Sequence, residues 1–360
     1  ADLAYELDDA DLLETLRILW EDLTTRKMYL TGGIGPSKHN EGFTDPYDLS
    51  NKNAYAETCA AIGLVFWAQR MLQLELDSRY ADVLERALYN GVLSGVSLSG
   101  DWFFYVNPLE SSGDHHRQTF YECACCPPNI NRLLPTIGGY LYSMQENLIA
   151  VHLYAASRTT FELAEGDVTL VQETDYPWDG VVCLNFTMAE PIRFTLKLRK
   201  PGWCQEAHIY LNNEPVKMED YLENGYICLE RTWQSGDELR LLWLMPVTRV
   251  YAHPFVQENA GKTALMRGPL VFCLEAADQS YPLYTLRFPN EMVFDSQFDP
   301  GLLGGVVVVQ GTAKAVKLND WESPLYQPAP PETIDAHFRA IPYYAWDNRS
   351  PGEMRVWVPL

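Results

Sequence analysis

The spacing of hydrophobic residues changes near residue 147, and it predicts helices before this point and strands after it. Residues Asp11 to Leu30 carry hydrophobic side chains at intervals close to 3.6 positions, which is typical of an amphipathic helix. Three further helices are predicted over Asn53 to Leu76, Tyr80 to Val96 and Pro127 to Met144. Adjacent prolines suit the first turn of the last helix, because N–H groups there have no partner within the helix.

After residue 147, hydrophobic and polar residues alternate in short runs that are separated by turn residues. Such alternation predicts half-buried strands, and their close spacing is typical of β-sandwiches. The predicted strands are Leu148 to Tyr154, Thr159 to Leu163, Val168 to Glu173, Val181 to Thr187, Ile192 to Leu198, Ala207 to Leu211, Tyr226 to Leu229 and Glu238 to Trp243. A break at Met245-Pro246 divides this region. We therefore expect a helical domain over residues 1–146, a β-sandwich over 147–246 and a second β-sandwich over 247–360.

Composition favours an enzyme that acts on a neutral or cationic ligand. The chain has 360 residues and a net charge of −21, from 48 acidic and 27 basic side chains. This acidity argues against nucleic acid and anionic membrane surfaces as partners, because both select for lysine and arginine. No hydrophobic run reaches the length of about 18 residues that a membrane-spanning helix needs. Eight cysteines are too few for a disulfide scaffold, so free thiols and a reducing, cytoplasmic location are expected.

The most informative motif is a cluster of three cysteines within four positions, Cys123-Ala124-Cys125-Cys126, followed by two prolines. Cysteines this close cannot all form disulfides with one another without strain. The adjacent Cys125 and Cys126 are therefore expected to be metal ligands, or one ligand and one reactive thiolate. The competing interpretation is a cluster of reduced structural thiols.

A second motif, Glu57-Thr58-Cys59, adds a carboxylate and a thiol. Two positions on a regular helix correspond to about 200° of rotation, so these side chains would face opposite ways. Both can bind one ion only at a helix start or a distorted turn; otherwise they are a capping carboxylate and a core thiol. Four cysteines and one glutamate exceed the four ligand positions of a tetrahedral zinc site, so at least one of them has another role.

Two further segments contain residues that suit a binding site. The glycine-rich loop Thr31 to Phe43 carries Glu41 and lacks the Gly-Lys-Ser/Thr spacing of a phosphate-binding loop. This loop either delivers one carboxylate into a cavity or is a plain surface loop. The aromatic run Trp102 to Tyr105, which precedes Asn107-Pro108, either lines a sugar site or belongs to the core.

Taken together, these segments resemble glycoside hydrolase family 127, the retaining β-L-arabinofuranosidases. The matching motifs are Thr31-Gly-Gly-Ile-Gly, Glu41-Gly-Phe, Tyr55-Ala-Glu-Thr-Cys-Ala, Phe103-Phe-Tyr-Val-Asn-Pro-Leu and Glu122-Cys-Ala-Cys-Cys-Pro-Pro-Asn. The resemblance implies an α+β multidomain chain, in which part of an all-helical (α/α)6 barrel precedes two β-sandwich domains. Because the helical part is too short for a whole barrel, we expect the chain to be the C-terminal portion of a longer protein.

The same resemblance implies a particular chemistry. It would be retaining hydrolysis of non-reducing terminal β-L-arabinofuranosides, with Cys125 as the nucleophile, Glu41 as the general acid/base and Tyr105 in contact with the substrate. The implied ligands of a zinc ion (Zn²⁺) are Glu57, Cys59, Cys125 and Cys126, which leaves Cys123 outside the site. The alternative function is a non-catalytic carbohydrate-binding protein in which zinc is structural. The expected partner is a small carbohydrate, and the oligomeric state is left open.

Overall fold

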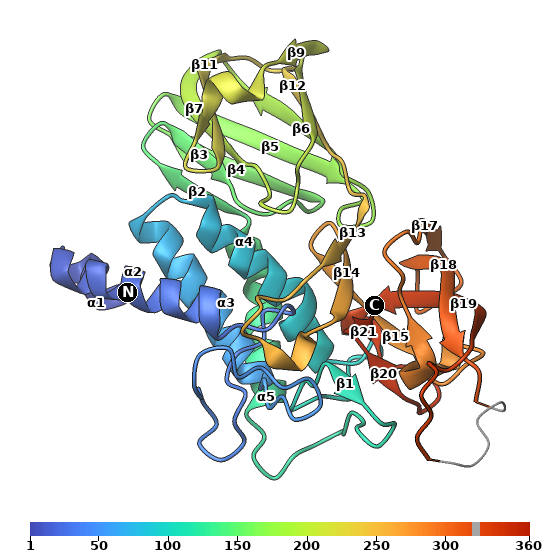
Figure 1. Ribbon diagram of the computed structural model, residues 1–360. Helices are drawn as coiled ribbons and strands as arrows, with labels where there is room; N and C mark the ends of the chain where they lie inside the picture. The colour runs from blue at the N-terminus through green and yellow to red at the C-terminus, as the bar shows by residue number, and fades with distance from the viewer. Residues whose placement is uncertain (319–324) are drawn as a thin grey trace. The chain divides into compact units, whose positions relative to one another are not determined.

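The structure is a computed structural model, and it describes residues 1–318 and 325–360 (Figure 1). The chain divides into two compact units, each built from segments that are far apart in the sequence. The first unit consists of Ala1–Glu21, Ile62–Arg86 and Asn131–Pro246. The second unit consists of Asp22–Ala61, Ala87–Ile130 and Val247–Leu360.

The described residues contain five α-helices, all of them before residue 134. They are α1 (Asp2–Leu7), α2 (Ala10–Arg26), α3 (Thr58–Leu74), α4 (Ser78–Arg86) and α5 (Cys126–Leu133). The part of the chain that the structure describes has no helix that is both long and hydrophobic enough to cross a membrane.

The expectation of a partial (α/α)6 barrel over residues 1–146 is wrong, because this part of the chain is not all-helical. Residues 27–57 and 96–125 are mostly irregular and lie between the helices. Gly32 and Gly35 in the first of these segments have φ angles of +74° and +75°, in the left-handed region that a right-handed helix cannot include. The five α-helices are therefore separate elements between long loops.

Backbone contacts and prolines explain why the helices are shorter than their hydrophobic spacing predicts. The N–H groups of Tyr55 and Ala56 donate to carbonyls of the preceding loop at 3.1 and 2.9 Å, so α3 begins only at Thr58. The predicted helix from Tyr80 to Val96 consists of α4 followed by a π-helical turn and a 3-10 turn. The α5 helix ends at Leu133, because the following Pro135 has no N–H to continue it.

The first unit contains two β-sheets that face each other (Figure 1). The six-stranded sheet has the order β4-β5-β6-β12-β8-β9, and the five-stranded sheet has the order β10-β11-β7-β3-β2. Their strands are β2 (Tyr142–Gln145), β3 (Leu148–Val151), β4 (Ser157–Leu163), β5 (Gly166–Thr174), β6 (Val181–Met188), β7 (Ile192–Arg199), β8 (Ala207–Leu211), β9 (Glu214–Val216), β10 (Leu222–Glu223), β11 (Tyr226–Trp233) and β12 (Glu238–Trp243). Phe186 on β6 contacts Trp233 on β11 with ring centroids 4.8 Å apart, so the core lies between the sheets.

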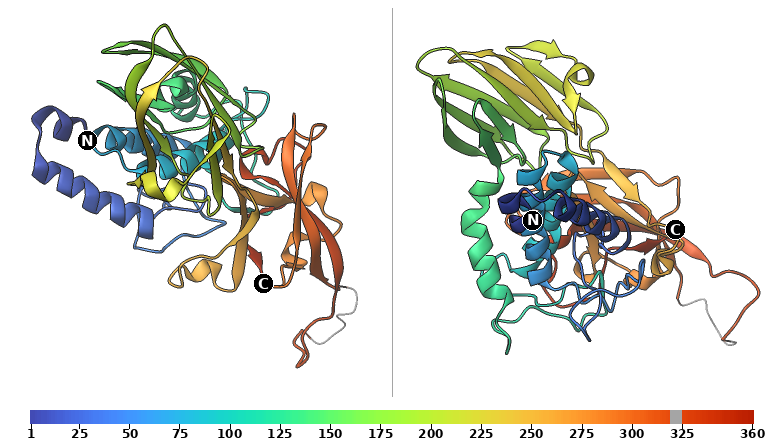
Figure 2. Two further views of the ribbon diagram at one scale, coloured as in Figure 1. Left: turned by 90° about the horizontal axis from the view of Figure 1, so that it is seen from above. Right: turned by 90° about the vertical axis from the view of Figure 1, so that its left-hand side faces the viewer.

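The second unit contains one antiparallel sheet of ten strands, which can be followed in two further views (Figure 2). Its strands are β1 (Glu110–Ser111), β13 (Val247–Val250), β14 (Lys262–Arg267), β15 (Leu270–Glu275), β16 (Leu286–Arg287), β17 (Phe294–Asp299), β18 (Val306–Val316), β19 (Thr333–Pro342), β20 (Met354–Arg355) and β21 (Val358–Pro359). The ten strands form one connected but branched network, in which β14 pairs with β13, β15 and β21. The pairing of β1 with β20 links the loop that precedes Cys125 to the C-terminal strands.

Candidate active site

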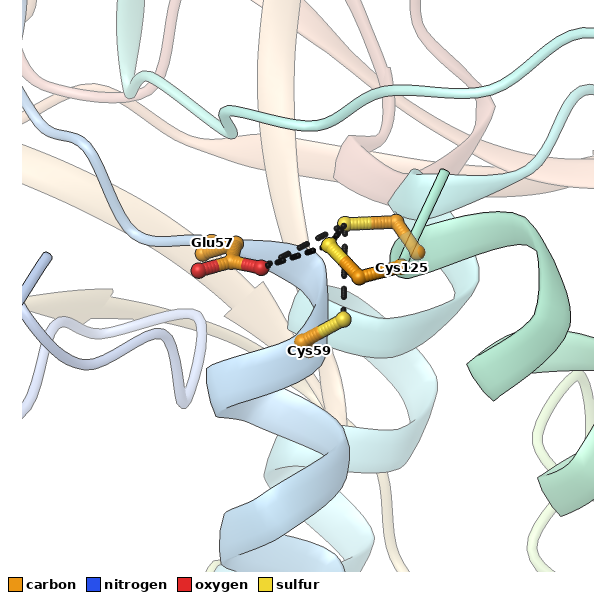
Figure 3. A group of neighbouring side chains, drawn as sticks. Glu57, Cys59 and Cys125 are labelled. Carbon is orange, nitrogen blue, oxygen red and sulfur yellow. Dashed lines mark hydrogen bonds between the residues drawn. The ribbon is translucent and has the colours of Figure 1, made fainter. Parts of the chain in front are cut away.

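Four side chains that the sequence predicts as metal ligands converge within the second unit. The ligand atoms of Glu57, Cys59, Cys125 and Cys126 all lie within 4.8 Å of one another. Figure 3 shows Glu57, Cys59 and Cys125 pointing toward a common centre. The remaining cysteine of the motif, Cys123, is exposed and lies outside this cluster.

The start of α3 explains how Glu57 and Cys59 reach the same site although they are two residues apart. Glu57 immediately precedes the helix, and its carbonyl accepts the N–H groups of Ala60 and Ala61 at 3.0 and 3.2 Å. The preceding Ala56 has a φ angle of +37°, so the chain turns sharply just before the helix. Because Glu57 lies outside the helix, the rotation of about 200° between two positions of a regular helix does not apply to Glu57 and Cys59. The structure thus has a helix start here, one of the two conditions under which both side chains can bind one ion.

A buried asparagine fixes this turn. The Asn107 side-chain amide donates to the Ala56 carbonyl at 3.0 Å and to the Thr58 hydroxyl at 2.9 Å. The side-chain oxygen of Asn107 accepts a hydrogen bond from the Ser94 hydroxyl at 2.8 Å. Thr58 in turn donates to the Phe104 carbonyl at 2.8 Å. Asn107 therefore holds the strained residue before Glu57 and the first residue of the helix in one arrangement.

The other two ligands lie at the start of α5. Cys125 immediately precedes this helix, and its carbonyl accepts the Asn129 N–H at 3.1 Å. Cys126 is the first helical residue, and Pro127 and Pro128 complete a first turn in which N–H groups have no partner within the helix. The N-termini of α3 and α5 thus both lie at the cluster. Helix N-termini carry partial positive charge, which stabilises a carboxylate and thiolates.

The donor set and its spacing fit a tetrahedral zinc ion. A zinc ion with Zn–S distances of about 2.3 Å places two sulfur ligands about 3.8 Å apart. The Sγ atoms of Cys59 and Cys126 are 3.5 Å apart, and those of Cys125 and Cys126 are 3.7 Å apart. Glu57 Oε1 lies 3.2 Å from the Cys125 Sγ and 3.7 Å from the Cys126 Sγ. These sulfur separations far exceed a disulfide bond of about 2.05 Å, so the cysteines are free thiols.

Without a cation the cluster disfavours a full set of thiolates. Burial raises the pKa of the Cys125 thiol to about 12, a hydrogen bond from Tyr105 opposes this shift, and the contact with Glu57 adds to it. The contact between Cys59 and Cys126 lowers the pKa of Cys59 and raises that of Cys126, so this pair shares one proton. A divalent cation would reverse this situation, because metal coordination deprotonates a thiol outright.

Glu41 lies outside the metal cluster, and two tyrosines connect it to Cys125. The Tyr55 hydroxyl donates to Glu41 Oε1 at 2.9 Å. The Tyr105 ring lies beside that of Tyr55, with ring centroids 5.9 Å apart, and the interaction of the Tyr105 hydroxyl with the Cys125 thiol is the largest cause of the raised pKa of Tyr105. Glu41 is itself exposed and has a φ angle of +48°. The structure therefore links a carboxyl group on a glycine-rich loop to a thiol through two phenol groups.

The aromatic run divides between the core and the site. Phe103 and Phe104 are buried, and Phe104 stacks on Trp346 with ring centroids 4.8 Å apart. Trp102 is exposed, and only Tyr105 reaches the cluster. Sequence reasoning assigned no role to Tyr55 or Asn107, although both lie inside the quoted motifs. The sequence offered one signal for each residue, which was its position. Tyr55 lies two residues before Glu57, and Asn107 lies two residues after the aromatic run.

Comparison with known proteins assigns the chain to a family. The GH127 catalytic domain of β-L-arabinofuranosidases matches residues 1–139, the GH127 middle domain matches 148–245, and the glycoside hydrolase family 127 C-terminal domain matches 247–359. A curated non-reducing end β-L-arabinofuranosidase from Bifidobacterium longum subsp. longum is 37% identical over 377 residues, which cover 98% of this chain and 56% of that protein.

Solved structures give the same result. The crystal structure of a GH127 β-L-arabinofuranosidase from Geobacillus stearothermophilus T6 matches with a TM-score of 0.97 and 48% identity, over 99% of this chain and 58% of that one. A second GH127 β-arabinofuranosidase matches with a TM-score of 0.93 and 35% identity, over 100% of this chain and 58% of that one. The chain thus spans a little more than half the length of these relatives. Together the three family models match almost every residue, and the chain belongs to glycoside hydrolase family 127, as its motifs predicted.

Proposed function

We propose that the protein is a retaining glycoside hydrolase that cleaves non-reducing terminal β-L-arabinofuranosides. Membership of glycoside hydrolase family 127 and the names of its relatives support the reaction class and the sugar. The observation that carries the proposal is the connected set of Glu41, Tyr55, Tyr105 and Cys125 beside the cluster of three thiols and one carboxylate. A purely structural metal site has no need for a second carboxyl group connected to one of its thiols.

In this proposal Glu57, Cys59, Cys125 and Cys126 hold a zinc ion. When bound, zinc supplies the positive charge that keeps the Cys125 sulfur deprotonated near neutral pH. The two helix N-termini and the fixed turn before Glu57 position the ligands before the ion arrives. Asn107 contributes to this order by holding Ala56 and Thr58.

Cys125 and Glu41 divide the first half of the reaction between them. The Cys125 sulfur attacks the anomeric carbon, and the bond from this carbon to the leaving oxygen breaks. Glu41 donates its proton to that oxygen, so the leaving group departs as a neutral alcohol. The result is a sugar joined to Cys125 through a carbon–sulfur bond. In an ordinary retaining enzyme a second carboxylate makes this bond, and the thiolate takes its place here.

Glu41 then acts as a base in the second half of the reaction. Its carboxylate removes a proton from water, whose oxygen attacks the anomeric carbon while the carbon–sulfur bond breaks. Two inversions at the same carbon give overall retention of configuration. Tyr55 holds the Glu41 carboxyl through a hydrogen bond of 2.9 Å. Tyr105 interacts with the Cys125 thiol and packs against Tyr55, so it lies between the nucleophile and the residue that holds the acid/base.

Metal content and hydrolysis, measured on the same protein preparation, test this proposal. We expect about one zinc per chain by elemental analysis and hydrolysis of p-nitrophenyl β-L-arabinofuranoside. Cys59→Ser should lose most of the zinc and the activity, because it removes one of four ligands. Cys123→Ser is the matched control, because this exposed cysteine lies outside the cluster and should keep both.

The Glu41→Gln variant separates an acid/base from a residue that only binds sugar. The p-nitrophenolate group leaves without protonation, whereas water still needs the base, so the variant should accumulate the sugar on Cys125. Mass spectrometry of a peptide containing Cys125 should show the gain of one pentose residue. Zinc and sugar binding without turnover in the parent protein would contradict the hydrolase and support the carbohydrate-binding alternative.

A further inference from the structure

A cavity in the second unit lies against Tyr55, the residue that donates to the candidate acid/base. It has a volume of about 670 Å³, and Tyr55 and Val106 form part of its wall. The loop that carries Glu41 contributes residues on both sides of this carboxylate, from Pro36 to His39 and at Thr44. Since Tyr55 is the side chain that donates to Glu41, one end of the cavity lies beside the candidate acid/base.

A second cavity borders the first. It has a volume of about 340 Å³ and is lined by residues 46–50 and by Phe255, Gln257 and Glu258. Asp48 and Ser50 line both cavities, so the two are neighbours with a common wall. Taken together, the two neighbouring cavities extend from the Glu41 loop, on both sides of Asp48 and Ser50, to residues of the C-terminal part of the chain.

An exposed aromatic ring lines the second cavity. Phe255 is 66% exposed, yet neighbouring rings hold it. Its ring centroid lies 5.3 Å from that of Tyr47 and 5.1 Å from that of His253, and the Tyr47 and His253 rings stack at 4.7 Å. Tyr47 has a φ angle of +68°, and its N–H donates to the Arg26 carbonyl at 2.8 Å. An exposed phenyl ring is thus held in a fixed orientation.

The two walls of the second cavity are tied together by a buried hydrogen bond. The Asn51 side-chain amide donates to the Asn259 side-chain oxygen at 2.7 Å, and both residues are buried. Asn51 directly follows the lining residue Ser50, and Asn259 directly follows the lining residue Glu258. The cavity is therefore formed by segments that are fixed to each other before any ligand binds.

We infer that these two cavities form a binding track for the leaving group of the substrate, and that the leaving group is an oligosaccharide chain. The inference rests on the proposed function. A residue that protonates the leaving oxygen lies at the border between the cleaved sugar and the leaving group. A cavity that begins beside Glu41 and is walled by its loop is therefore placed to hold the leaving group.

The lining has the chemistry of a site for several sugar residues. Ser37, Lys38, Asp48, Ser50 and Asn53 offer hydroxyl, ammonium, carboxylate and amide groups to sugar hydroxyls. Phe255 offers a flat hydrophobic face, on which the C–H face of a sugar ring stacks. The volumes of both cavities lie within the range of about 300–1,000 Å³ that is typical of pockets for small ligands. One pentose would leave most of the track empty.

Binding measurements on a Glu41→Gln background test the track without turnover. Two probes are titrated calorimetrically: methyl β-L-arabinofuranoside, and a linear tetrasaccharide that ends in a β-L-arabinofuranosyl residue. Adding Phe255→Ala should weaken tetrasaccharide binding about tenfold, the equivalent of one lost aromatic contact, and leave the methyl glycoside unchanged. Adding Phe298→Ala, which truncates another exposed phenylalanine of this unit on β17, should change neither affinity.

The two hypotheses fail in different ways. Equal tetrasaccharide affinity with and without Phe255→Ala, or no tetrasaccharide binding at all, overturns the track. Hydrolysis is measured separately in the parent protein, with its own Glu41. If the parent cleaves neither probe but Phe255→Ala still weakens tetrasaccharide binding selectively, the proposed function is overturned, and the cavities remain a binding site for an oligosaccharide chain that is not a leaving group. Thermal unfolding of each variant confirms that the truncation has not unfolded the chain.

Discussion

Tyr105 lies between the candidate nucleophile and the residue that holds the candidate acid/base. Burial raises the pKa of the Cys125 thiol, and the hydrogen bond from Tyr105 acts in the opposite direction. Tyr105→Phe removes this bond and keeps the ring. Because a hydrogen bond to a charged group contributes about 1.5–3 kcal/mol, we expect kcat to fall at least about tenfold while the zinc content stays the same. Hydrolysis of p-nitrophenyl β-L-arabinofuranoside and elemental analysis of the same samples measure the two effects.

Tyr121→Phe is the matched control for this prediction. The Tyr121 hydroxyl donates to the Phe103 carbonyl at 2.8 Å and accepts the Tyr105 N–H at 3.2 Å, so both of these bonds are to the backbone. Its loss should lower the free energy of unfolding by about 1 kcal/mol and change kcat little. If both variants lost kcat equally, or if Tyr105→Phe lost zinc, Tyr105 would have a structural role instead.

At the scale of elements, the site depends on where α3 begins. Asn107 is 2% exposed and provides two donors and one acceptor to the turn before this helix. Asn107→Ala leaves buried polar partners unsatisfied, each at about 1–3 kcal/mol, and frees the backbone at Ala56. We expect lower stability together with at least tenfold weaker zinc binding, because Glu57 and Cys59 would no longer be held on the same side. Competition with a chromogenic chelator measures the zinc affinity.

Asn90→Ala separates the loss of stability from the loss of the metal site. Asn90 is also buried in the second unit, where its side chain binds the Pro269 carbonyl at 3.0 Å and the Val271 N–H at 2.8 Å. This variant should be destabilised to a similar extent and keep its zinc affinity. If both variants lost zinc equally, general destabilisation would explain the effect and the turn would have no special role.

The elements that the sequence predicts well are those whose pattern is local. The strands Ala207 to Leu211 and Glu238 to Trp243 have the predicted bounds, because alternation alone marks a strand with one buried face. The start of α3 was predicted five residues too early. Nothing in the spacing of hydrophobic residues reveals that Tyr55 and Ala56 bond to a loop about 20 residues before them. For the same reason, local patterns could not show that the motifs at Glu57 and Cys125 meet in one site. Only the resemblance to the family predicted this.

A buried ion cluster joins helix α4 to strand β7 in the first unit. Arg199 is fully buried and donates to Asp82 at 2.6 Å and to Glu85 at 2.5 Å, and Tyr176 also donates to Glu85. Arg199→Met leaves the buried Glu85 carboxylate without its cation, so we expect the free energy of unfolding to fall by about 3–5 kcal/mol. Urea unfolding measures this loss.

The double variant Arg199→Met, Glu85→Gln tests the reason for that loss. It removes the buried carboxylate as well, so part of the lost stability should return. An additive loss in the double variant would show that packing, and not the unpaired charge, dominates.

At the scale of the whole molecule, the candidate site and the inferred track draw on three separate stretches of one unit. Glu41 and Glu57 lie in Asp22–Ala61, Cys125 lies in Ala87–Ile130, and the inferred track adds Phe255 from Val247–Leu360. Each stretch alone has a plain structural interpretation. Their chemistry depends on long-range contacts such as the Asn51–Asn259 pair, which no local pattern reports. This explains why residue types could be predicted from the sequence, whereas the path from Glu41 to Phe255 required the fold.

Acid sensitivity is a further property of the whole molecule, and it is expected from His152. This histidine is 2% exposed in the first unit, and its ring nitrogens bind Ser143 and Tyr226, each at 2.7 Å. Burial lowers its pKa from 6.5 to about 3, and Arg199 acts in the same direction. His152 is therefore neutral in the folded protein at pH values where it is charged in the unfolded chain.

The sign of the resulting pH dependence follows from this difference. Above pH 6.5 both states hold a neutral His152, while between 6.5 and about 3 only the unfolded state binds the proton, so stability falls as pH decreases. The loss is about 1.4 kcal/mol per pH unit for this group. Urea unfolding at pH 7, 6, 5 and 4 should show a smaller slope in His152→Gln than in the parent. Tyr226→Phe should be less stable at every pH and keep the parent slope, because the ring remains buried. A His152→Gln variant as acid-sensitive as the parent would assign the effect to other groups.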